Sequence, residues 1–146
     1  MSEADGPGLV IRDAMPADAG AIAALIVALG YEVSAGEVRS RLAALGKAGQ
    51  TALVADRGGL VGVLTTSVMI VLHRPHAVGR ISMLVVAEVA RGGGIGRALV
   101  AEAEKRLAAA GCGLIEVTSN SKRLRAHAFY EKLGYERTSL RFAKPL

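Results

Sequence analysis

The apolar positions near the start of the chain follow a helical period after one short extended run. Residues 9–12 form that run and predict a strand, and Pro16 after it suits the first turn of a helix. Residues 17–29 carry apolar side chains at helical spacing, and Gly30 is expected to end this helix. The positions that form its apolar stripe are Ile22, Leu25, Ile26 and Leu29.

A second helix and a hairpin are predicted next. Ser34 suits an N-cap, and Glu37 three residues later completes a capping-box pattern. The buried stripe of this helix is expected to be Val38, Leu42 and Leu45. Residues 51–57 and 60–72 are two β-rich runs joined by a pair of glycines, which is a signal for a two-residue hairpin turn.

The rest of the chain predicts, in order, a loop, a strand, a long helix, a strand, a shorter helix and a final strand. These elements span residues 73–76, 80–86, 94–110, 114–118, 123–133 and 135–142. Glu102 and Arg106 lie one turn apart on the polar side of the long helix, where they can pair. The resulting order, βααβββαβαβ, predicts a mixed α/β sheet with helices on its faces. Residues 1–8 are expected to be a loose tail.

The length and composition favour one folded domain. The chain has 146 residues, of which 51% are hydrophobic and only 3% aromatic, so its core must be built from Ala, Val, Leu and Ile. It contains no internal repeat, low-complexity tract or long linker, and residues 1–146 are therefore expected to form a single domain.

The cysteine content and the termini bear on redox chemistry and location. Cys112, the only cysteine, excludes an internal disulfide and a cysteine-based metal cluster, and we interpret it as a structural thiol. The first residues lack the basic start of a secretory signal. No apolar run approaches the roughly 18–20 residues that a membrane-spanning helix needs. We therefore expect a cytoplasmic protein with no membrane partner.

The net charge of +5 is concentrated in one part of the chain. Residues 1–87 hold seven basic and seven acidic side chains, which cancel, whereas residues 88–146 hold eleven basic and six acidic ones. Either an anionic partner bound by the C-terminal part or the solvation of helix faces would explain this excess.

A glycine-rich turn between an apolar strand and the long helix carries the most specific signal. Gly92, Gly93, Gly94 and Gly96 let the backbone approach a ligand and present N–H groups beside the positive end of the helix dipole. This arrangement predicts an anion site, most often for phosphate. Neither the glycine spacing of a dinucleotide fingerprint nor the Gly-Lys-Ser/Thr triplet of a Walker A loop is present.

The pattern that does fit is Arg-x-x-Gly-x-Gly at Arg91, Gly94 and Gly96. Here the chain resembles the GNAT superfamily of N-acetyltransferases, whose pyrophosphate loop follows the fourth strand in this way. The second motif of that family, Ala-x-x-Phe-Tyr-x-x-x-Gly-Phe/Tyr, matches a further segment. The matching residues are Ala126, Phe129, Tyr130, Gly134 and Tyr135. The two motifs together cover about residues 80–136.

The resemblance implies a GNAT-like, mostly antiparallel central sheet of six to seven strands flanked by about four helices. It also implies that acetyl-CoA is the co-substrate and that a primary amine attacks its thioester directly. Tyr130 occupies the position that usually supplies a proton to the leaving thiolate, and backbone N–H groups of the fourth strand usually meet the oxyanion. The residues thereby assigned to acetyl-CoA are Leu84, Val85, Val86, Arg91, Gly92, Gly93, Gly94, Ile95, Gly96, Arg97, Asn120 and Tyr130.

The chain departs from the family pattern on the fourth strand. Many members carry a proton-relaying carboxylate there, but this chain has Ser82 and Met83. An ordered water, an acceptor amine of low pKa or Glu116 on the neighbouring strand are the alternatives. Many members also have Asn where this chain has Arg123, and Asn120 is the candidate for the equivalent contact. The nearby cations, Lys122, Arg123 and Arg125, either meet the nucleotide phosphates or are plainly solvated.

The histidines do not point to a metal. His73 and His76 lie in the loop before the fourth strand, and a pair of surface histidines with no third ligand does not make a metal site. His127 either touches the cofactor or is structural. We therefore expect no metal. Tyr31, after the first helix, is expected near the acceptor if the family layout holds, and the acceptor is a small-molecule or peptide amine.

Two other functions are left open by the sequence. The missing carboxylate suits a non-catalytic acyl-CoA sensor or partner-binding module. The basic C-terminal part suits nucleic-acid binding, but the few aromatic residues and the lack of a known nucleic-acid fold argue against it, so we expect no such partner. A homodimer is an analogy with similar proteins only.

Overall fold

The computed structural model describes residues 8–146, so the predicted tail lies outside the described residues except for Gly8. The chain divides into two compact units, one ending at Glu116 and one spanning Val117–Leu146. Within the described residues, no helix is both long enough and apolar enough to cross a membrane.

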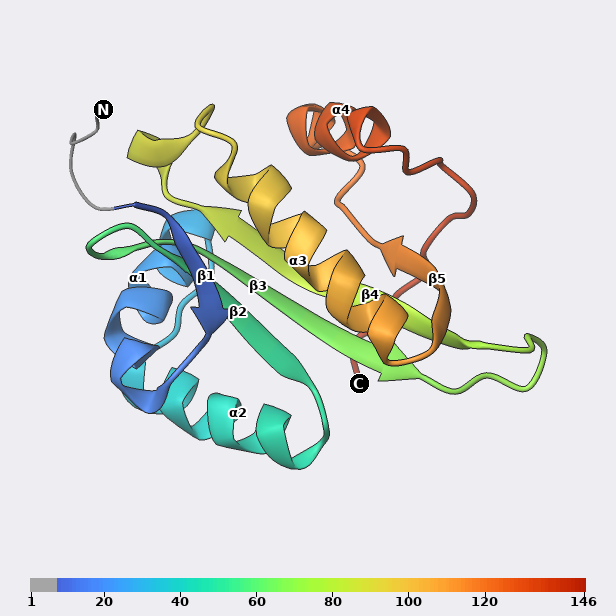
Figure 1. Ribbon diagram of the computed structural model, residues 1–146, viewed down its shortest axis with the longest axis horizontal. Helices are drawn as coiled ribbons and strands as arrows, with labels where there is room; N and C mark the ends of the chain where they lie inside the picture. The colour runs from blue at the N-terminus through green and yellow to red at the C-terminus, as the bar shows by residue number, and fades with distance from the viewer. Residues whose placement is uncertain (1–7) are drawn as a thin grey trace. The chain divides into compact units, whose positions relative to one another are not determined.

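The first unit contains a five-stranded sheet and three α-helices, with β1 nearest the amino terminus (Figure 1). The strands are β1 (Val10–Asp13), β2 (Thr51–Asp56), β3 (Leu60–Met69), β4 (Ala77–Val86) and β5 (Cys112–Val117), of which the last residue already belongs to the second unit. The helices are α1 (Ala19–Leu29), α2 (Ala35–Lys47) and α3 (Ile95–Ala109), and short 3₁₀ turns cover Pro16–Asp18 and Glu88–Ala90. The second unit contains α4 (Leu124–Lys132).

The strands lie in chain order, β1-β2-β3-β4-β5. The first three pairings are antiparallel. Strands β4 and β5 point the same way in Figure 1, and α3 makes the crossover that two parallel neighbours need. The sheet is therefore mixed, and the C-terminal end of β4 leads directly into the turn before α3.

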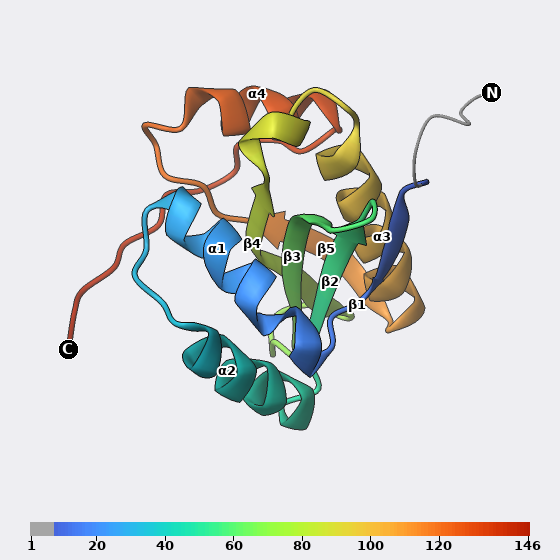
Figure 2. The same ribbon diagram turned by 90° about the vertical axis from the view of Figure 1, so that its left-hand side faces the viewer.

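Helices cover both faces of the sheet (Figure 2). On one face α1 and α2 pack on the sheet around a cluster that includes Ile22, Val38, Val63 and Val85. On the other face α3 contributes a buried stripe at helical spacing. The buried residues of this stripe are Ile95, Leu99, Val100, Ala103 and Leu107.

Two strand glycines let α3 approach the sheet closely. A Cβ atom at Gly62 would lie 3.0 Å from Cδ1 of Leu99, and one at Gly79 would lie 2.9 Å from Cδ1 of Leu107. The absence of a side chain at both positions therefore sets the spacing between α3 and strands β3 and β4.

A buried ion pair fixes the entry into α1. Asp18 is 8% exposed, and its carboxylate accepts hydrogen bonds from Nη1 of Arg12 at 2.8 Å and from Nη2 at 3.0 Å. The backbone N–H of Met15 donates to the same carboxylate at 2.7 Å. Arg12 also reaches Oδ2 of Asp56 on β2 at 3.1 Å. One guanidinium thus joins β1, β2 and the 3₁₀ turn before α1.

Most predicted elements are confirmed. Helix α1 ends at Gly30 with φ 114°, and Ser34 and Glu37 form both hydrogen bonds of the capping box. The predicted helix 94–110 is α3, in which Arg106 donates to Glu102 at 2.9 Å. The predicted strand 60–72 ends earlier, at Met69.

The predicted final strand is wrong, and with it the expected six to seven strands and the last β of the predicted order. Residues 135–146 have no regular structure, and the described sheet has five strands. The side chains of Leu140 and Phe142 are 83% and 90% exposed. Apolar alternation supplies side chains for a sheet face, but a strand also needs a neighbour for its backbone groups, and this segment pairs with none of the described strands. The expectation of about four helices agrees with α1–α4.

Candidate functional site

The C-terminal half of β4 forms one wall of the candidate site. Val86, Val85 and Leu84 pair with Gly62, Val63 and Leu64 of β3. Val85 is buried against the α1 face, whereas Leu84 and Val86 are partly exposed. The strand stops at Val86, and the N–H of Ala87 donates to the carbonyl of Val61 at 2.8 Å. These hydrogen bonds hold residues 84–86, whose backbone is predicted to contact acetyl-CoA, in a paired strand.

The glycine-rich turn lies between β4 and α3. After the 3₁₀ turn, Gly92 and Gly94 adopt φ values of +84° and +80°, a region that side chains other than glycine rarely enter. Gly94 is the N-cap of α3 and provides no side-chain hydrogen bond to the helix. The N–H groups in the first turn of α3 therefore receive no side-chain cap from Gly94, and such N–H groups can bind an external anion. Arg91 and Arg97, both exposed, add positive charge on either side of this turn.

A pair of hydroxyl groups marks an irregularity in β4. The ladder between β3 and β4 shifts register so that Thr65 pairs with Met83 and Thr66 with Ile81, which leaves Ser82 as the extra residue of a β-bulge. Oγ of Ser82 lies 2.9 Å from Oγ1 of Thr65 and donates to the carbonyl oxygen of Thr65 at 3.2 Å. Ser82 is exposed. The bulge therefore places the exposed hydroxyl group of Ser82 beside that of the half-buried Thr65 on the neighbouring strand.

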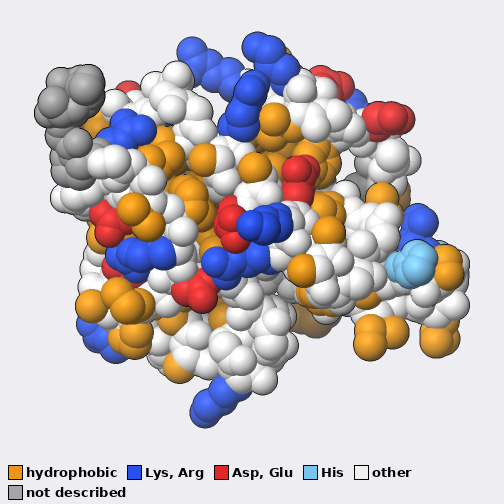
Figure 3. All heavy atoms as spheres, viewed as in Figure 1, with side chains coloured by type: hydrophobic (Ala, Val, Ile, Leu, Met, Phe, Trp, Pro, Cys, Tyr) orange, Lys and Arg blue, Asp and Glu red, His pale blue; other side chains and the backbone are white. Residues whose placement is uncertain are grey.

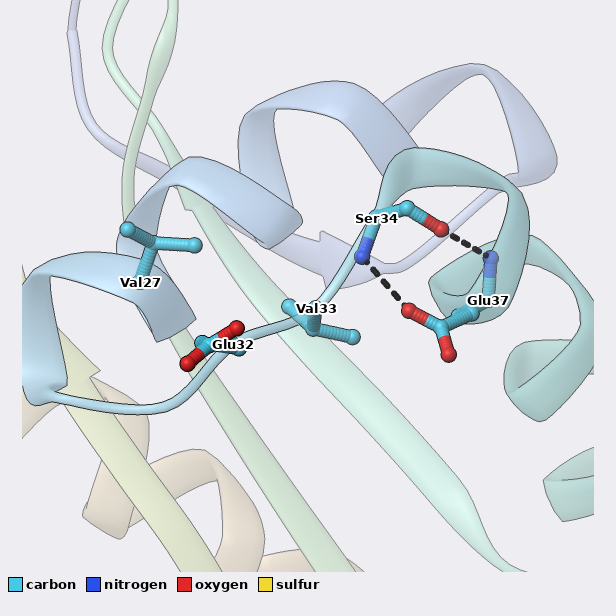
Figure 4. Close-up of a pocket in the computed structure, with 5 residues that line it drawn as sticks. All are labelled: Val27, Glu32, Val33, Ser34 and Glu37. Carbon is cyan, nitrogen blue, oxygen red and sulfur yellow. Dashed lines mark hydrogen bonds between the residues drawn. The ribbon is translucent and has the colours of Figure 1, made fainter.

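A pocket of about 610 Å³ lies between the end of α1 and the start of α2. Val27, Glu32, Val33, Ser34 and Glu37 line it (Figure 4). Oε1 of Glu37 accepts the N–H of Ser34 at 2.9 Å, so this carboxylate is engaged in the helix cap. Glu32 extends from the loop between the two helices in the same view. The pocket thus combines apolar walls with a carboxylate that the cap does not use.

In the second unit, the turn before α4 is held by the carbonyl of Asn120. This oxygen accepts the N–H of Arg123 at 2.9 Å and lies 2.8 Å from Nε2 of His127. Because a carbonyl only accepts, Nε2 carries the proton, and Nδ1 of His127 is buried without a partner in the structure. The side-chain Oδ1 of Asn120 accepts the N–H of Lys122 at 2.9 Å. Asn120 and His127 therefore hold this turn through hydrogen bonds, and a contact of either residue with the cofactor stays a prediction.

Tyr130 lies on α4 within an aromatic cluster. Its ring meets Phe129 edge-on at a centroid distance of 5.1 Å and Tyr135 at 5.8 Å. The N–H of Tyr135 donates to the carbonyl of Tyr130 at 3.0 Å. Burial raises the pKa of the Tyr130 phenol above its ordinary value. The phenol is therefore neutral at neutral pH, so it has a proton to donate and is not ionised to act as a base.

The remaining candidates are placed as follows. Glu116 on β5 has an oxygen 3.9 Å from Nη1 of Arg80 on β4, so it is partly neutralised by a cation. The side chain of His76 lies against Gly113, where an added Cβ atom would be 2.9 Å from Cβ of His76 and 3.0 Å from Cδ2 of its ring. Histidine and apolar side chains gather on the surface over the loop between β3 and β4, where Ile70 is 91% exposed (Figure 3). Among the described residues, no three His, Cys, Asp or Glu side chains come together.

The structure brings part of the predicted acetyl-CoA site together. Residues 84–86 and 91–97 follow one another along β4, the turn and α3 in the first unit, whereas Asn120 and Tyr130 lie in the second unit. Thr65 and Glu32 were not among the site residues predicted from the sequence. Thr65 could have been noticed as a polar position within an apolar strand, but its contact with Ser82 depends on the bulge, which no sequence signal indicated.

Comparison with known proteins agrees with this geometry. The model of the acetyltransferase (GNAT) domain matches residues 48–137, more than half of the chain. An aminoalkylphosphonate N-acetyltransferase of Salmonella typhimurium is 38% identical over 94 residues, which are 64% of this chain and 61% of that protein. The matched part thus spans less than two thirds of that relative.

Solved structures share the fold over nearly the whole chain. An acetyltransferase of Trypanosoma brucei superposes with a TM-score of 0.82 at 26% identity, covering 95% of this chain and 100% of that one. A glucosamine-6-phosphate N-acetyltransferase of Arabidopsis thaliana superposes with the same score at 20% identity, covering 94% and 98%, which shows a common fold. With the domain match and the glycine-capped α3, these findings establish that the chain belongs to the GNAT family of acetyltransferases.

Proposed function

We propose that this chain is an N-acetyltransferase that uses acetyl-CoA and acetylates a primary amine by direct attack. The observation that carries the proposal is the succession of β4, a turn with two left-handed glycines and α3, which begins at Gly94 without a side-chain cap. Both units, residues 1–146, are proposed to act as one acetyltransferase domain.

The turn suits the pyrophosphate of coenzyme A. Backbone N–H groups at the start of α3 provide donors, the helix dipole adds positive potential, and a side chain at Gly92 or Gly94 would strain the backbone. We propose that residues 91–97 bind the pyrophosphate. Leu84, Val85 and Val86 are proposed to meet the acyl end through the backbone of β4, and Asn120 and Tyr130 are proposed to contact acetyl-CoA.

The proposed reaction forms one bond and breaks one. The amine nitrogen attacks the thioester carbonyl carbon, a C–N bond forms, and the C–S bond breaks. The amine proton leaves to water, and the thiolate takes a proton from Oη of Tyr130, which regains one from solvent. Burial keeps this phenol protonated, and backbone N–H groups of β4 are proposed to stabilise the oxyanion.

The acceptor is proposed to enter from the face of the sheet that α1 and α2 cover. The pocket between these helices offers apolar walls and the carboxylate of Glu32, which would attract a cationic amine, and Tyr31 precedes it in the same loop. The Salmonella relative is named for aminoalkylphosphonates, which carry an amine and a phosphonate. We therefore place small aminoalkylphosphonates first among the acceptors to test, ahead of peptide amines.

A second candidate function is supported by one observation. Strands β3 and β4 contain no Asp or Glu, so no carboxylate on them can take a proton from the acceptor. A domain that binds acetyl-CoA but transfers nothing would fit this strand pair equally well.

The deciding experiment is mass spectrometry of acetyl transfer from acetyl-CoA to a panel of amines, together with calorimetry of acetyl-CoA binding. The panel contains 2-aminoethylphosphonate, spermidine, an aminoglycoside, free amino acids and lysine or N-terminal peptides. Acetylation of one class would support the enzyme and name its acceptor. Binding of acetyl-CoA without transfer to any amine would favour the sensor, and the absence of binding would contradict both.

A further inference from the structure

The hydroxyl groups of Ser82 and Thr65 at the β4 bulge use both of their protons in hydrogen bonds with each other and with the backbone. Ser82 and Thr65 together own two hydroxyl protons. Ser82 donates its proton to the carbonyl oxygen of Thr65, 3.2 Å away, and Thr65 then donates its own to Oγ of Ser82 at 2.9 Å. Both protons are consumed within the pair. The lone pairs that remain on Oγ and Oγ1 can only accept, so the pair presents a neutral acceptor to any ligand.

The pair lies on the face where the proposed acceptor enters, with Ser82 exposed and Thr65 half-buried. Val63 and Thr65 have the same parity along β3 and therefore point to the same face, and Val63 packs in the α1 cluster. Ser82 lies two residues before Leu84, which is about 7 Å along a strand. The two acceptor oxygens thus lie close to the segment of β4 that is proposed to hold the thioester.

We propose that the Ser82–Thr65 hydroxyl pair binds the attacking amine of the acceptor and that the protein acts on the neutral amine. This inference rests on the proposed transferase function. A neutral amine donates an N–H to Oγ of Ser82 and keeps its lone pair for the thioester carbon. As the C–N bond forms, the nitrogen becomes positive and this hydrogen bond strengthens, so the pair stabilises the transition state more than the bound substrate.

The charges around the pair support a neutral amine. On β3 and α1 there is no ionisable side chain, and on β4 the only one is Arg80, 3.9 Å from Glu116 of β5. Helix α3 packs on the opposite face, and the pocket loop carries Glu32. The ionisable residues of α3 are Arg97, Glu102, Glu104, Lys105 and Arg106. Since neither β3 nor β4 carries a carboxylate, these strands offer no base, and the acceptor is proposed to lose its proton to water before it reacts.

The test compares wild type with S82A, T65V and S82D, using 2-aminoethylphosphonate or, if it is not turned over, the amine of the panel that is acetylated fastest. In wild type, kcat/KM should rise with pH toward the pKa of the amine itself. S82A and T65V should each lower kcat/KM by about tenfold, and the loss should lie in kcat. Because the pair acts as one unit, the S82A/T65V double variant should have nearly the same kcat/KM as either single variant. S67A, which removes a hydroxyl further along β3, is the matched control and should match wild type.

S82D provides a test in the opposite direction. A carboxylate at the bulge can take the amine proton, so the rising limb of the pH profile should move to lower pH and kcat/KM below the pKa of the amine should exceed that of wild type. Thermal melting and acetyl-CoA binding establish that each variant is folded. Wild-type kinetics in S82A and T65V, or an unshifted profile in S82D, would overturn the inference while leaving the transferase intact. Absence of transfer by wild type to every amine would instead overturn the proposed function, and the inference with it.

Discussion

Gly79 of β4 lies directly beneath the side chain of Leu107 on α3, so closely that a Cβ atom on Gly79 would be 2.9–3.1 Å from Cδ1, Cδ2 and Cγ of the leucine. Leu107 is 3% exposed, and its neighbours leave it little room to move aside. The close approach of α3 to β4 thus depends on the absence of one methyl group.

We expect Gly79→Ala to lower the free energy of unfolding by about 1–3 kcal/mol, the usual cost of overpacking a core. Urea denaturation followed by circular dichroism measures it. Gly46→Ala on α2, where a Cβ atom would meet nothing within 4 Å, is the matched control and should stabilise by up to about 1 kcal/mol. Equal stability of the Gly79 variant and wild type would show that α3 can shift freely.

Gly94→Ala tests the anion site at the start of α3. Alanine at φ +80° strains the N-cap by about 1–2 kcal/mol and distorts the N–H groups proposed to bind pyrophosphate. We expect the Kd for acetyl-CoA, measured by calorimetry, to rise about tenfold. Gly20→Ala in α1, which has a free environment for a Cβ atom, should leave the Kd unchanged. An unchanged Kd in both variants would remove this turn from the proposed site.

Asp18→Asn tests the ion pair that anchors α1. The variant loses charge-assisted hydrogen bonds from Arg12, and we expect the free energy of unfolding at pH 7 to fall by about 2–4 kcal/mol. The hydrogen bonds from Arg12 lower the pKa of Asp18, so its contribution is full above the ordinary carboxyl pKa of about 3.9 and is lost as pH falls through the lower folded pKa.

The stability difference between wild type and Asp18→Asn should therefore shrink below about pH 4, as seen in urea titrations at several pH values. Glu88→Gln, at an exposed carboxylate, is the control. A difference that stays constant down to acid pH would mean that Asp18 is not held ionised by Arg12.

Tyr130→Phe tests the proposed acid. The variant keeps the ring and its edge contacts with Phe129 and Tyr135 but removes the proton donor. We expect kcat to fall by at least about tenfold with the affinity for acetyl-CoA little changed, since a general acid contributes roughly 10²–10⁴ to a rate. An unchanged kcat would remove Tyr130 from the mechanism.

The same variant isolates the titration of Tyr130. The difference between the alkaline absorbance titrations of wild type and Tyr130→Phe belongs to this phenol. Because burial raises its pKa, the midpoint should lie above the ordinary value of about 10, and the stability that the neutral phenol gives is lost as pH rises through that midpoint. A midpoint at or below the ordinary value would mean that the ring is solvated.

The fold could be predicted wherever a local signal set the structure. Gly30 and the Ser34–Glu37 box mark helix ends through backbone conformation and hydrogen bonds within a few residues, and both are as expected. The predicted strand at 135–142 failed because pairing depends on a distant neighbour, which the alternation of Leu140 and Phe142 does not supply.

The candidate site divides in the same way. The turn at Gly92 and Gly94 was predicted from its four glycines, which let a backbone approach a ligand, and the structure adds that both residues have positive φ. The contact between Ser82 and Thr65, which are 17 residues apart in the chain, was not predicted, because it depends on the register of β3 with β4 and on the bulge that shifts this register. The roles of Tyr130 and Asn120 toward acetyl-CoA stay predictions.

The shared use of Arg12 has an evolutionary consequence. One guanidinium serves both Asp18 and Asp56, so a substitution at position 12 leaves the buried carboxylate of Asp18 without a cation, whereas a substitution at position 18 leaves a cation whose second partner remains. Positions 12 and 18 should therefore covary among related sequences, and where the pair is exchanged Asp18 should be lost before Arg12. The order in which these residues can be exchanged therefore follows from the two ion pairs that Arg12 makes.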